Sequence, residues 1–347
     1  MSTTPIPYSK AAELDPRINT PRPKIDASLV AIVDAFPLPE KLDLGFMRGV
    51  SGGGDEAAAF VCNADTVLQS APQLKHEEHS IRGPSGDNLL LSVFSPIEPT
   101  NSALPCLYHI HGGGMVAGDR FSGVTQLIEL LRDIECVIVS VEYRLAPETR
   151  APGPAEDCFA GLVWLSKNAS TLGISESEVV VWGISGGGCL AAATCLMARD
   201  RKIPRIPIKG QMLLSPMLDD RCDSISDKQF EYSIPWCGIT NRMAWECVLG
   251  EERGSANITP YQSPSRATDL SNLPPTYVDA AECEVFRDQA VKFATDLWRG
   301  GSTCELHVWP GAFHLFDGMD NPDVPLIHNA FLAKRAWLRR IMETHST

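Results

Sequence analysis

Short, strand-like apolar runs recur along most of the chain, and amphipathic stretches separate them. The runs have the length of strands, whereas the stretches place apolar residues at the three- to four-residue spacing of one helix face. The predicted strands are Leu89–Phe94, Leu107–His111, Cys136–Tyr143, Glu178–Trp182, Gly210–Leu214, Thr276–Ala280 and Glu305–Trp309. The predicted helices are Val124–Arg132, Glu156–Lys167, Leu190–Arg199, Arg287–Arg299 and Pro325–Met342. This alternation predicts an α/β fold with a mostly parallel sheet covered by helices on both faces.

Two segments depart from the alternation, and we expect them to form a helical cap. Residues 1–75 lack strand alternation but show helical periodicity at Ile25–Phe36 and around Ala57–Leu68. Residues 216–262 open with an acidic stretch, which precedes a predicted helix capped by Thr240. The remaining residues, 76–215 and 263–347, are predicted to form the core of a single domain.

Composition and charge narrow the class of protein. Hydrophobic residues make up 44% of the chain and charged residues 21%, as in a packed globular enzyme. The net charge of −13 argues against nucleic acid or an anionic membrane as a partner, because both attract clustered Lys and Arg. Met1–Lys10 lacks the pattern of a secretory signal, so we expect a cytoplasmic protein. The nearly uncharged run Val179–Ala198 is as long as a membrane span, but its central glycines would break a helix, and we predict no span.

Neither the cysteines nor the histidines have the spacing of a metal site. The 11 cysteines are scattered without a Cys-x-x-Cys pair, and we interpret them as reduced thiols in the core. His109 and His111 alternate along a strand, so their side chains point to opposite faces, and His111 is expected to order the loop that follows it. His76 and His79 lie in a polar stretch without a third ligand, which favours a surface role. We therefore predict no metal and no cofactor.

Ser185 stands in the pattern Gly-x-Ser-x-Gly, between an apolar strand and an Ala-rich helix. This setting is what a nucleophile elbow requires, because the turn is too tight for side chains on its flanks and lifts the hydroxyl clear of the sheet. The helix N-terminus also favours developing negative charge. A glycine-rich turn without catalysis gives the same bare pattern, but the strand and the helix around it favour a nucleophile. Serine alone is a weak nucleophile, so a base must lie nearby.

The sequence His111-Gly112-Gly113-Gly114 directly follows another predicted strand. Three glycines let backbone N–H groups approach a substrate oxygen without obstruction, as an oxyanion hole requires. A phosphate-binding loop is the alternative, but the Lys-Ser/Thr of a P-loop is missing.

His314 is the predicted base. It follows the last predicted strand, at the carboxyl edge of a parallel sheet where ligands bind. His307 falls inside that strand, His328 falls inside the final helix, and His345 is in the C-terminal tail, which makes all three poorer candidates.

The acid is expected between the nucleophile and the base in the chain, after the strand Thr276–Ala280. Asp279 lies within the strand, and Asp288 begins the next helix, where capping or the helix dipole explains a carboxylate. Glu284 lies on the loop between them, close to Glu282.

With these motifs in place, the chain resembles the hormone-sensitive-lipase-like family of α/β-hydrolases, the bacterial type IV esterases. The resemblance runs from about residue 87 to the end. It is carried by His111–Gly114, Tyr143–Glu148, Pro154–Cys158, Ser263-Pro264 and Leu273–Pro275. It implies the α/β-hydrolase fold, with the N-terminal helices and the 216–262 insertion as the cap that covers the pocket.

The resemblance also implies the acid. The family places its acid at the start of an Asp-Pro-Leu-Arg-Asp motif, and Glu284 matches that first position. A triad of Ser185, Glu284 and His314 follows, with Asp279 as the fallback acid.

The oxyanion hole is implied in the same way. By the resemblance, the N–H groups of Gly113, Gly114 and Gly186 form it, and Gly112 shapes the turn. Ile184-Ser185-Gly186 stands where many relatives have Asp-Ser-Ala. This departure alters the packing of the turn but keeps the backbone donor of residue 186.

Together these features predict hydrolysis of a small-molecule carboxylic ester. No strongly apolar lid is evident, which favours short-chain or bulky soluble esters over emulsified fat. Acyl transfer through the same acyl-enzyme stays open, as does a non-catalytic receptor like the plant gibberellin receptors, which lose the catalytic His. The oligomeric state, a homodimer included, is also open.

Overall fold

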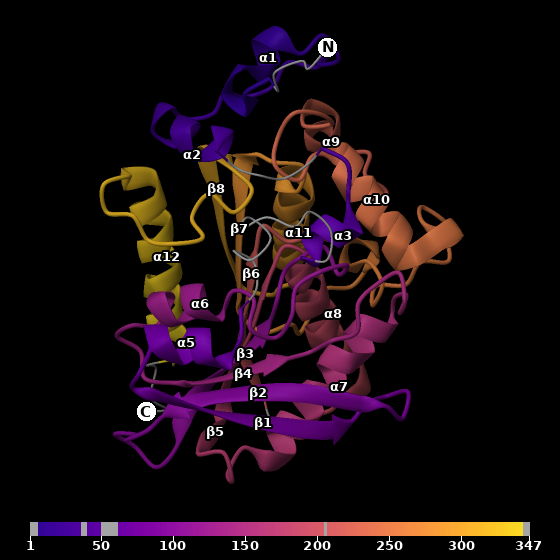
Figure 1. The fold of residues 1–347 in the computed structure, drawn as a ribbon. Helices are drawn as coiled ribbons and strands as arrows, with labels where there is room; N and C mark the ends of the chain where they lie inside the picture. The colour runs from indigo at the N-terminus through magenta and orange to yellow at the C-terminus, as the bar shows by residue number, and fades with distance from the viewer. Residues whose placement is uncertain (1–5, 36–39, 50–61, 205–206, 343–347) are drawn as a thin grey trace.

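An eight-stranded sheet forms the centre of the molecule (Figure 1). The computed structural model describes residues 6–35, 40–49, 62–204 and 207–342. The strands are β1 (Leu74–Arg82), β2 (Asn88–Pro96), β3 (Leu104–Ile110), β4 (Val137–Val141), β5 (Ile174–Ile184), β6 (Ile208–Leu214), β7 (Thr276–Cys283) and β8 (Cys304–Phe313). Their order is β1-β2-β4-β3-β5-β6-β7-β8, with β2 antiparallel to both neighbours and the other pairs parallel. The predicted mostly parallel sheet is confirmed.

Helices cover both faces of the sheet. One face carries α7 (Gly153–Asn168), α8 (Gly186–Arg201) and α11 (Arg287–Arg299), and the other carries α5 (Ala64–Ser70), α6 (Val124–Leu130) and α12 (Pro325–Met342). Two apolar clusters fill the layers: Leu162 and Phe293 belong to the first, and Leu127 and Trp337 to the second. Strand β4 is buried at every position, as expected for a strand covered on both sides.

Strand β1 was not predicted, because it lies at the edge of the sheet. It pairs with β2 from Leu74 to Arg82, and its residues alternate between exposed and half-buried. His76 and His79, for which we expected a surface role, lie on this edge strand with half-buried rings. His76 Nε2 lies 2.9 Å from Ser92 Oγ, and the ring packs on Phe94.

Short helices gather beside one end of the sheet in Figure 1. They are α1 (Ala11–Leu14), α2 (Val30–Asp34), α3 (Leu44–Met47), α9 (Ile225–Gln229) and α10 (Gly238–Leu249), with 3₁₀ turns at Tyr8–Lys10, Ala27–Leu29, Gly250–Glu252 and Pro264–Arg266. The N-terminal segment lies against the 216–262 segment. The Arg22 guanidinium donates to the carbonyls of Tyr232 (2.9 Å) and Ser233 (3.2 Å), and Gln229 donates to Pro21 O (2.8 Å).

Two details of this region differ from the sequence prediction. Thr240 does not cap α10: the helix begins at Gly238 after Cys237, and the Thr240 hydroxyl donates to Glu40 O (2.7 Å) instead. The helical periodicity at Ile25–Phe36 becomes a 3₁₀ turn followed by the short α2, and Phe36 lies outside the described residues, as do residues 57–61.

No helix in the described ranges is both long and apolar enough to cross a membrane. Within the same ranges, no group of His, Cys, Asp and Glu side chains is arranged to hold a metal ion. The 11 cysteines are free thiols, most of them buried.

Candidate active site

Ser185 occupies a strained turn between β5 and α8. Its backbone has φ 56° and ψ −120°, in the left-handed half of the map that a residue with a side chain rarely adopts. The glycines beside it allow the turn, because a Cβ on Gly183 would lie 2.2 Å from Gly187 O. The Ser185 N–H donates to Leu214 O (2.9 Å), which fixes the turn to the end of β6. This is the geometry of a nucleophile elbow.

His314 and Glu284 extend from Ser185 in one hydrogen-bonded chain. His314 Nε2 lies 3.1 Å from Ser185 Oγ, and His314 Nδ1 lies 2.6 Å from Glu284 Oε2. The other Glu284 oxygen accepts the N–H of Ala281 (2.7 Å). All three side chains are buried: Ser185 and His314 are 3% exposed and Glu284 is 0% exposed. The structure thus brings the three predicted residues together.

The positions of these three residues in the fold explain why their side chains come together. Ser185 follows β5, Glu284 follows β7 and His314 follows β8. The carboxyl ends of parallel strands lie at one edge of the sheet, so three loops distant in sequence converge there. The rings of Phe286 and His314 form a T-shaped pair with their centroids 5.1 Å apart.

The other carboxylates considered for the acid have different partners. Asp279 Oδ1 lies 3.3 Å from Ser215 N, and its Oδ2 lies 3.5 Å from Lys334 Nζ. Burial raises the pKa of Asp279 to about 6. Glu282 accepts the N–H of Gly311 (2.8 Å), and Asp288 accepts the N–H of Ser226 (2.8 Å).

The three-glycine loop packs directly on the start of α8. Gly113 and Gly114 have φ 97° and 63°, so glycine suits both positions. A Cβ on Gly186 would lie 2.7 Å from Met115 N and 2.8 Å from Gly114 Cα, which explains why glycine rather than alanine follows the serine in this chain. In the described part of the chain, no hydrogen bond occupies the N–H groups of Gly113, Gly114 and Gly186.

His111 orders this loop, as the sequence predicted. Its Nδ1 lies 2.8 Å from Gly112 O, and its ring stacks on Tyr143 at 4.0 Å between centroids. The Tyr143 hydroxyl donates to His111 O (2.9 Å). Burial lowers the pKa of His111 to about 4, so the ring is neutral near pH 7. His109 points to the other face of the sheet, where it lies 2.7 Å from Ser140 Oγ and stacks on Trp182.

The remaining histidines have other partners. His307 pairs with Glu305 (2.9 Å) and His328 with Asp320 (3.0 Å), while His345 lies outside the described residues.

Sequence reasoning missed two residues near the site. Trp236, from the 216–262 segment, lies against the glycine loop: a Cβ on Gly114 would be 2.3 Å from its Cη2. Lys334 of α12 is buried beside Asp279. No local sequence motif marks either residue, because each reaches the site through contacts with residues that are distant in the sequence.

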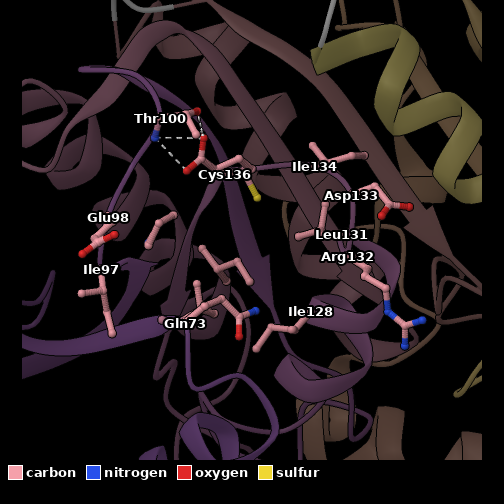
Figure 2. A pocket seen from close by; sticks show the side chains of 14 residues that line it. Gln73, Ile97, Glu98, Thr100, Ile128, Leu131, Arg132, Asp133, Ile134 and Cys136 are labelled. Carbon is pink, nitrogen blue, oxygen red and sulfur yellow. Dashed lines mark hydrogen bonds between the residues drawn. The ribbon is translucent and has the colours of Figure 1, made fainter.

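A cavity of about 870 Å³ lies away from these residues (Figure 2). Its lining includes the end of β2 and the start of β4, the amino end of a parallel strand, and contains none of Ser185, Glu284 and His314. Two of its lining residues are joined by a hydrogen bond: the backbone N–H of Thr100, labelled in Figure 2, donates to the Glu135 carboxylate (3.0 Å).

Known proteins resemble the chain in sequence and fold. A family model described as the alpha/beta hydrolase fold matches residues 107–318. The arylesterase of Saccharolobus solfataricus is 34% identical over 234 residues, which are 66% of this chain and 73% of that protein. Carboxylesterase NlhH of Mycobacterium tuberculosis is 29% identical over 297 residues, 84% and 89% of the two chains. The solved bacterial heroin esterase has a TM-score of 0.79 and 31% identity, over 92% of this chain and 98% of that one.

The chain therefore belongs to the α/β-hydrolase family. Its relatives are esterases of the kind expected for the hormone-sensitive-lipase-like branch, and the protein is a serine-type ester hydrolase.

Proposed function

We propose that the protein hydrolyses carboxylic esters through an acyl-enzyme on Ser185, with His314 as the base and Glu284 as the acid. The observation that carries the proposal is the continuous chain from Ser185 Oγ to His314 (3.1 Å) and from His314 to Glu284 (2.6 Å). A strained serine turn, a base within reach and a buried acid behind the base form the arrangement that activates a hydroxyl.

The first half of the reaction forms the acyl-enzyme. His314 Nε2 takes the proton of Ser185 as Oγ attacks the ester carbonyl carbon. The N–H groups of Gly113, Gly114 and Gly186 receive the negative oxygen, and each such donor is worth about 10²–10³ in rate. Glu284 holds the Nδ1–H of His314 and stabilises the imidazolium. The C–O bond to the alcohol then breaks, and His314 Nε2 gives its proton to the leaving oxygen.

The second half releases the acid. His314 removes a proton from water, the oxygen attacks the acyl carbonyl, and the same N–H groups hold the new oxyanion. The bond to Ser185 Oγ breaks as Oγ regains a proton from His314. These steps use only side chains and backbone groups of this chain.

The substrates we propose are short-chain or bulky soluble esters. Residues 1–75 and 216–262 form the cap in this proposal, and the remainder forms the hydrolase core. The contact of Trp236 with the Gly114 loop supports a role for the cap in limiting the space beside the carbonyl. Relatives named arylesterase and heroin esterase support a pocket that accepts ring-bearing esters.

The test is hydrolysis of p-nitrophenyl acetate and p-nitrophenyl butyrate. Ser185→Ala is expected to abolish turnover, whereas Ser177→Ala, an exposed serine near the other end of β5, should keep it. Turnover that survives in Ser185→Ala would overturn the proposal.

A further inference from the structure

A buried cluster of three charged side chains lies behind the proposed triad. Lys334 on α12 contacts two carboxylates: it forms a close ion pair with Asp317, and its Nζ lies 3.5 Å from Asp279 Oδ2. The side chains of Lys334, Asp279 and Asp317 are 5%, 4% and 9% exposed. Taking charges out of water costs about as much free energy as a well-formed ion pair recovers, so stability alone does not explain such a cluster.

The cluster connects the three segments that carry the triad. Asp317 lies three residues after His314, on the loop that follows β8. Asp279 lies on β7, which leads to Glu284. The Asp279 carbonyl and carboxylate both accept from Ser215 N, at 3.0 and 3.3 Å. Ser215 follows Leu214, whose carbonyl accepts the N–H of Ser185.

The charge balance of the cluster also points away from a purely stabilising role. Two carboxylates share one ammonium, so one negative charge is in excess. Burial raises the pKa of Asp279, which means that its charged form is costly where it sits. Burial would also lower the pKa of Lys334, but the two aspartates outweigh it and raise that pKa. Lys334 is therefore charged near neutral pH and remains bound to both aspartates.

We propose that Lys334 is a positioning residue for ester hydrolysis, which holds the His314 loop, through Asp317, against the Glu284 strand, through Asp279. The inference rests on the proposed function of Ser185, Glu284 and His314. A clamp of this kind keeps His314 within reach of both neighbours, and a misplacement of about 1 Å can cost about 10²-fold in rate.

The test compares variants that weaken one arm of the clamp at a time. Asp317→Asn and Asp279→Asn each leave Lys334 with one counter-charge, and an asparagine at 279 can still accept from Ser215 N. We expect kcat to fall about tenfold in each variant, because the geometry of the triad changes. KM should stay within about twofold, because the residues that bind the substrate do not change. The rate of Ser185 phosphonylation by a phosphonate ester should fall in parallel. Lys334→Met should be slower still, and if it fails to fold, the two asparagine variants decide.

Stability and a matched lysine serve as controls. Asp279→Asn should be at least as stable to urea as the wild type at pH 8 and still be slower, a combination that a merely structural role does not give. Lys209→Met removes a lysine near the start of β6 that pairs with Glu178 on β5 (2.9 Å), and kcat of this variant should not change. If both asparagine variants keep kcat within twofold, the clamp is wrong. If the wild type itself hydrolyses no ester, the proposed function fails instead, so the two failures are distinguishable.

Discussion

Ser185 shows how one residue combines strain with support. A non-glycine residue in its backbone conformation costs about 1–3 kcal/mol. Hydrogen bonds on both sides of the residue offset this cost: its N–H donates to Leu214 O, and its carbonyl accepts from Gly188 N and Met217 N, both at 3.0 Å. The strained turn is thus tied to β6 and to the segment after it, which keeps the hydroxyl in place.

At the residue scale, the role of Glu284 as the acid can be tested by comparing it with Glu305, another glutamate that pairs with a histidine. Glu284→Gln keeps the shape of the side chain but removes the charge that stabilises the His314 imidazolium. We expect kcat to fall about 10³- to 10⁴-fold, as when the acid of a triad becomes an amide. The measurement is kcat for p-nitrophenyl butyrate.

The control is Glu305→Gln, which removes the carboxylate from a half-exposed Glu–His pair with His307 on β8. It should leave kcat within about twofold. A small loss in Glu284→Gln combined with a crippled Asp279→Asn would reassign the acid to Asp279.

Sequence predicted the residues that sit in local motifs. The strand and helix around Ser185, and the loop position of His314, are properties of neighbouring residues, so each could be placed from the chain alone. Glu284 needed the family motif, because four carboxylates lie in the same stretch and only the fold separates their partners. Trp236 and Lys334 carry no local signal, since their contacts depend on how distant segments pack.

At the element scale, Arg22 is one of the residues that attach the N-terminal segment to the 216–262 segment. The guanidinium donates to two carbonyls of the 216–262 segment and packs over the Phe230 ring at 5.5 Å. Arg22→Ala leaves those carbonyls without this donor. Because hydrogen bonds to charged groups contribute about 1.5–3 kcal/mol each, we expect faster amide exchange across residues 15–35 and 229–236.

The matched control for that prediction is Lys24→Ala. Lys24 is exposed and lies 4.0 Å from Glu13, an ion pair of little expected value. Its exchange pattern should match the wild type. Unchanged protection in Arg22→Ala, measured by hydrogen exchange, would show that other contacts hold the segment.

Elements with strong hydrophobic periodicity were the ones predicted well. The bounds of α11 and α12 agree with the prediction, because each has one buried face and one polar face. Strand β1 was missed because an edge strand needs no continuous apolar run: only one neighbour pairs with it, and water covers much of its surface.

At the scale of the whole molecule, the buried cluster at Asp279 makes stability depend on pH. The groups that face Asp279 are Lys334, Asp317 and Glu284, and burial is the main cause of its raised pKa of about 6. An acid with a higher pKa in the folded state binds more protons there than when unfolded, so its contribution to stability falls as pH rises from about 4 to 6. Asparagine at 279 cannot titrate.

We therefore expect the wild type to lose stability relative to Asp279→Asn as pH rises over this range. Above this range, the stability difference between the two proteins should keep its shifted value. Urea unfolding of both proteins at several values between pH 4.5 and 7.5 measures the difference. A difference that is constant, or that shifts in favour of the wild type, would contradict this account of the cluster.

The central claim is that His314 and Glu284 activate Ser185. Its most direct test is covalent labelling by a fluorophosphonate, followed by mapping of the modified peptide by mass spectrometry. We expect a single adduct, on Ser185, formed at once in the wild type, far more slowly in His314→Ala and not at all in Ser185→Ala. An adduct on another serine, or equally fast labelling of Ser185 without His314, would contradict it.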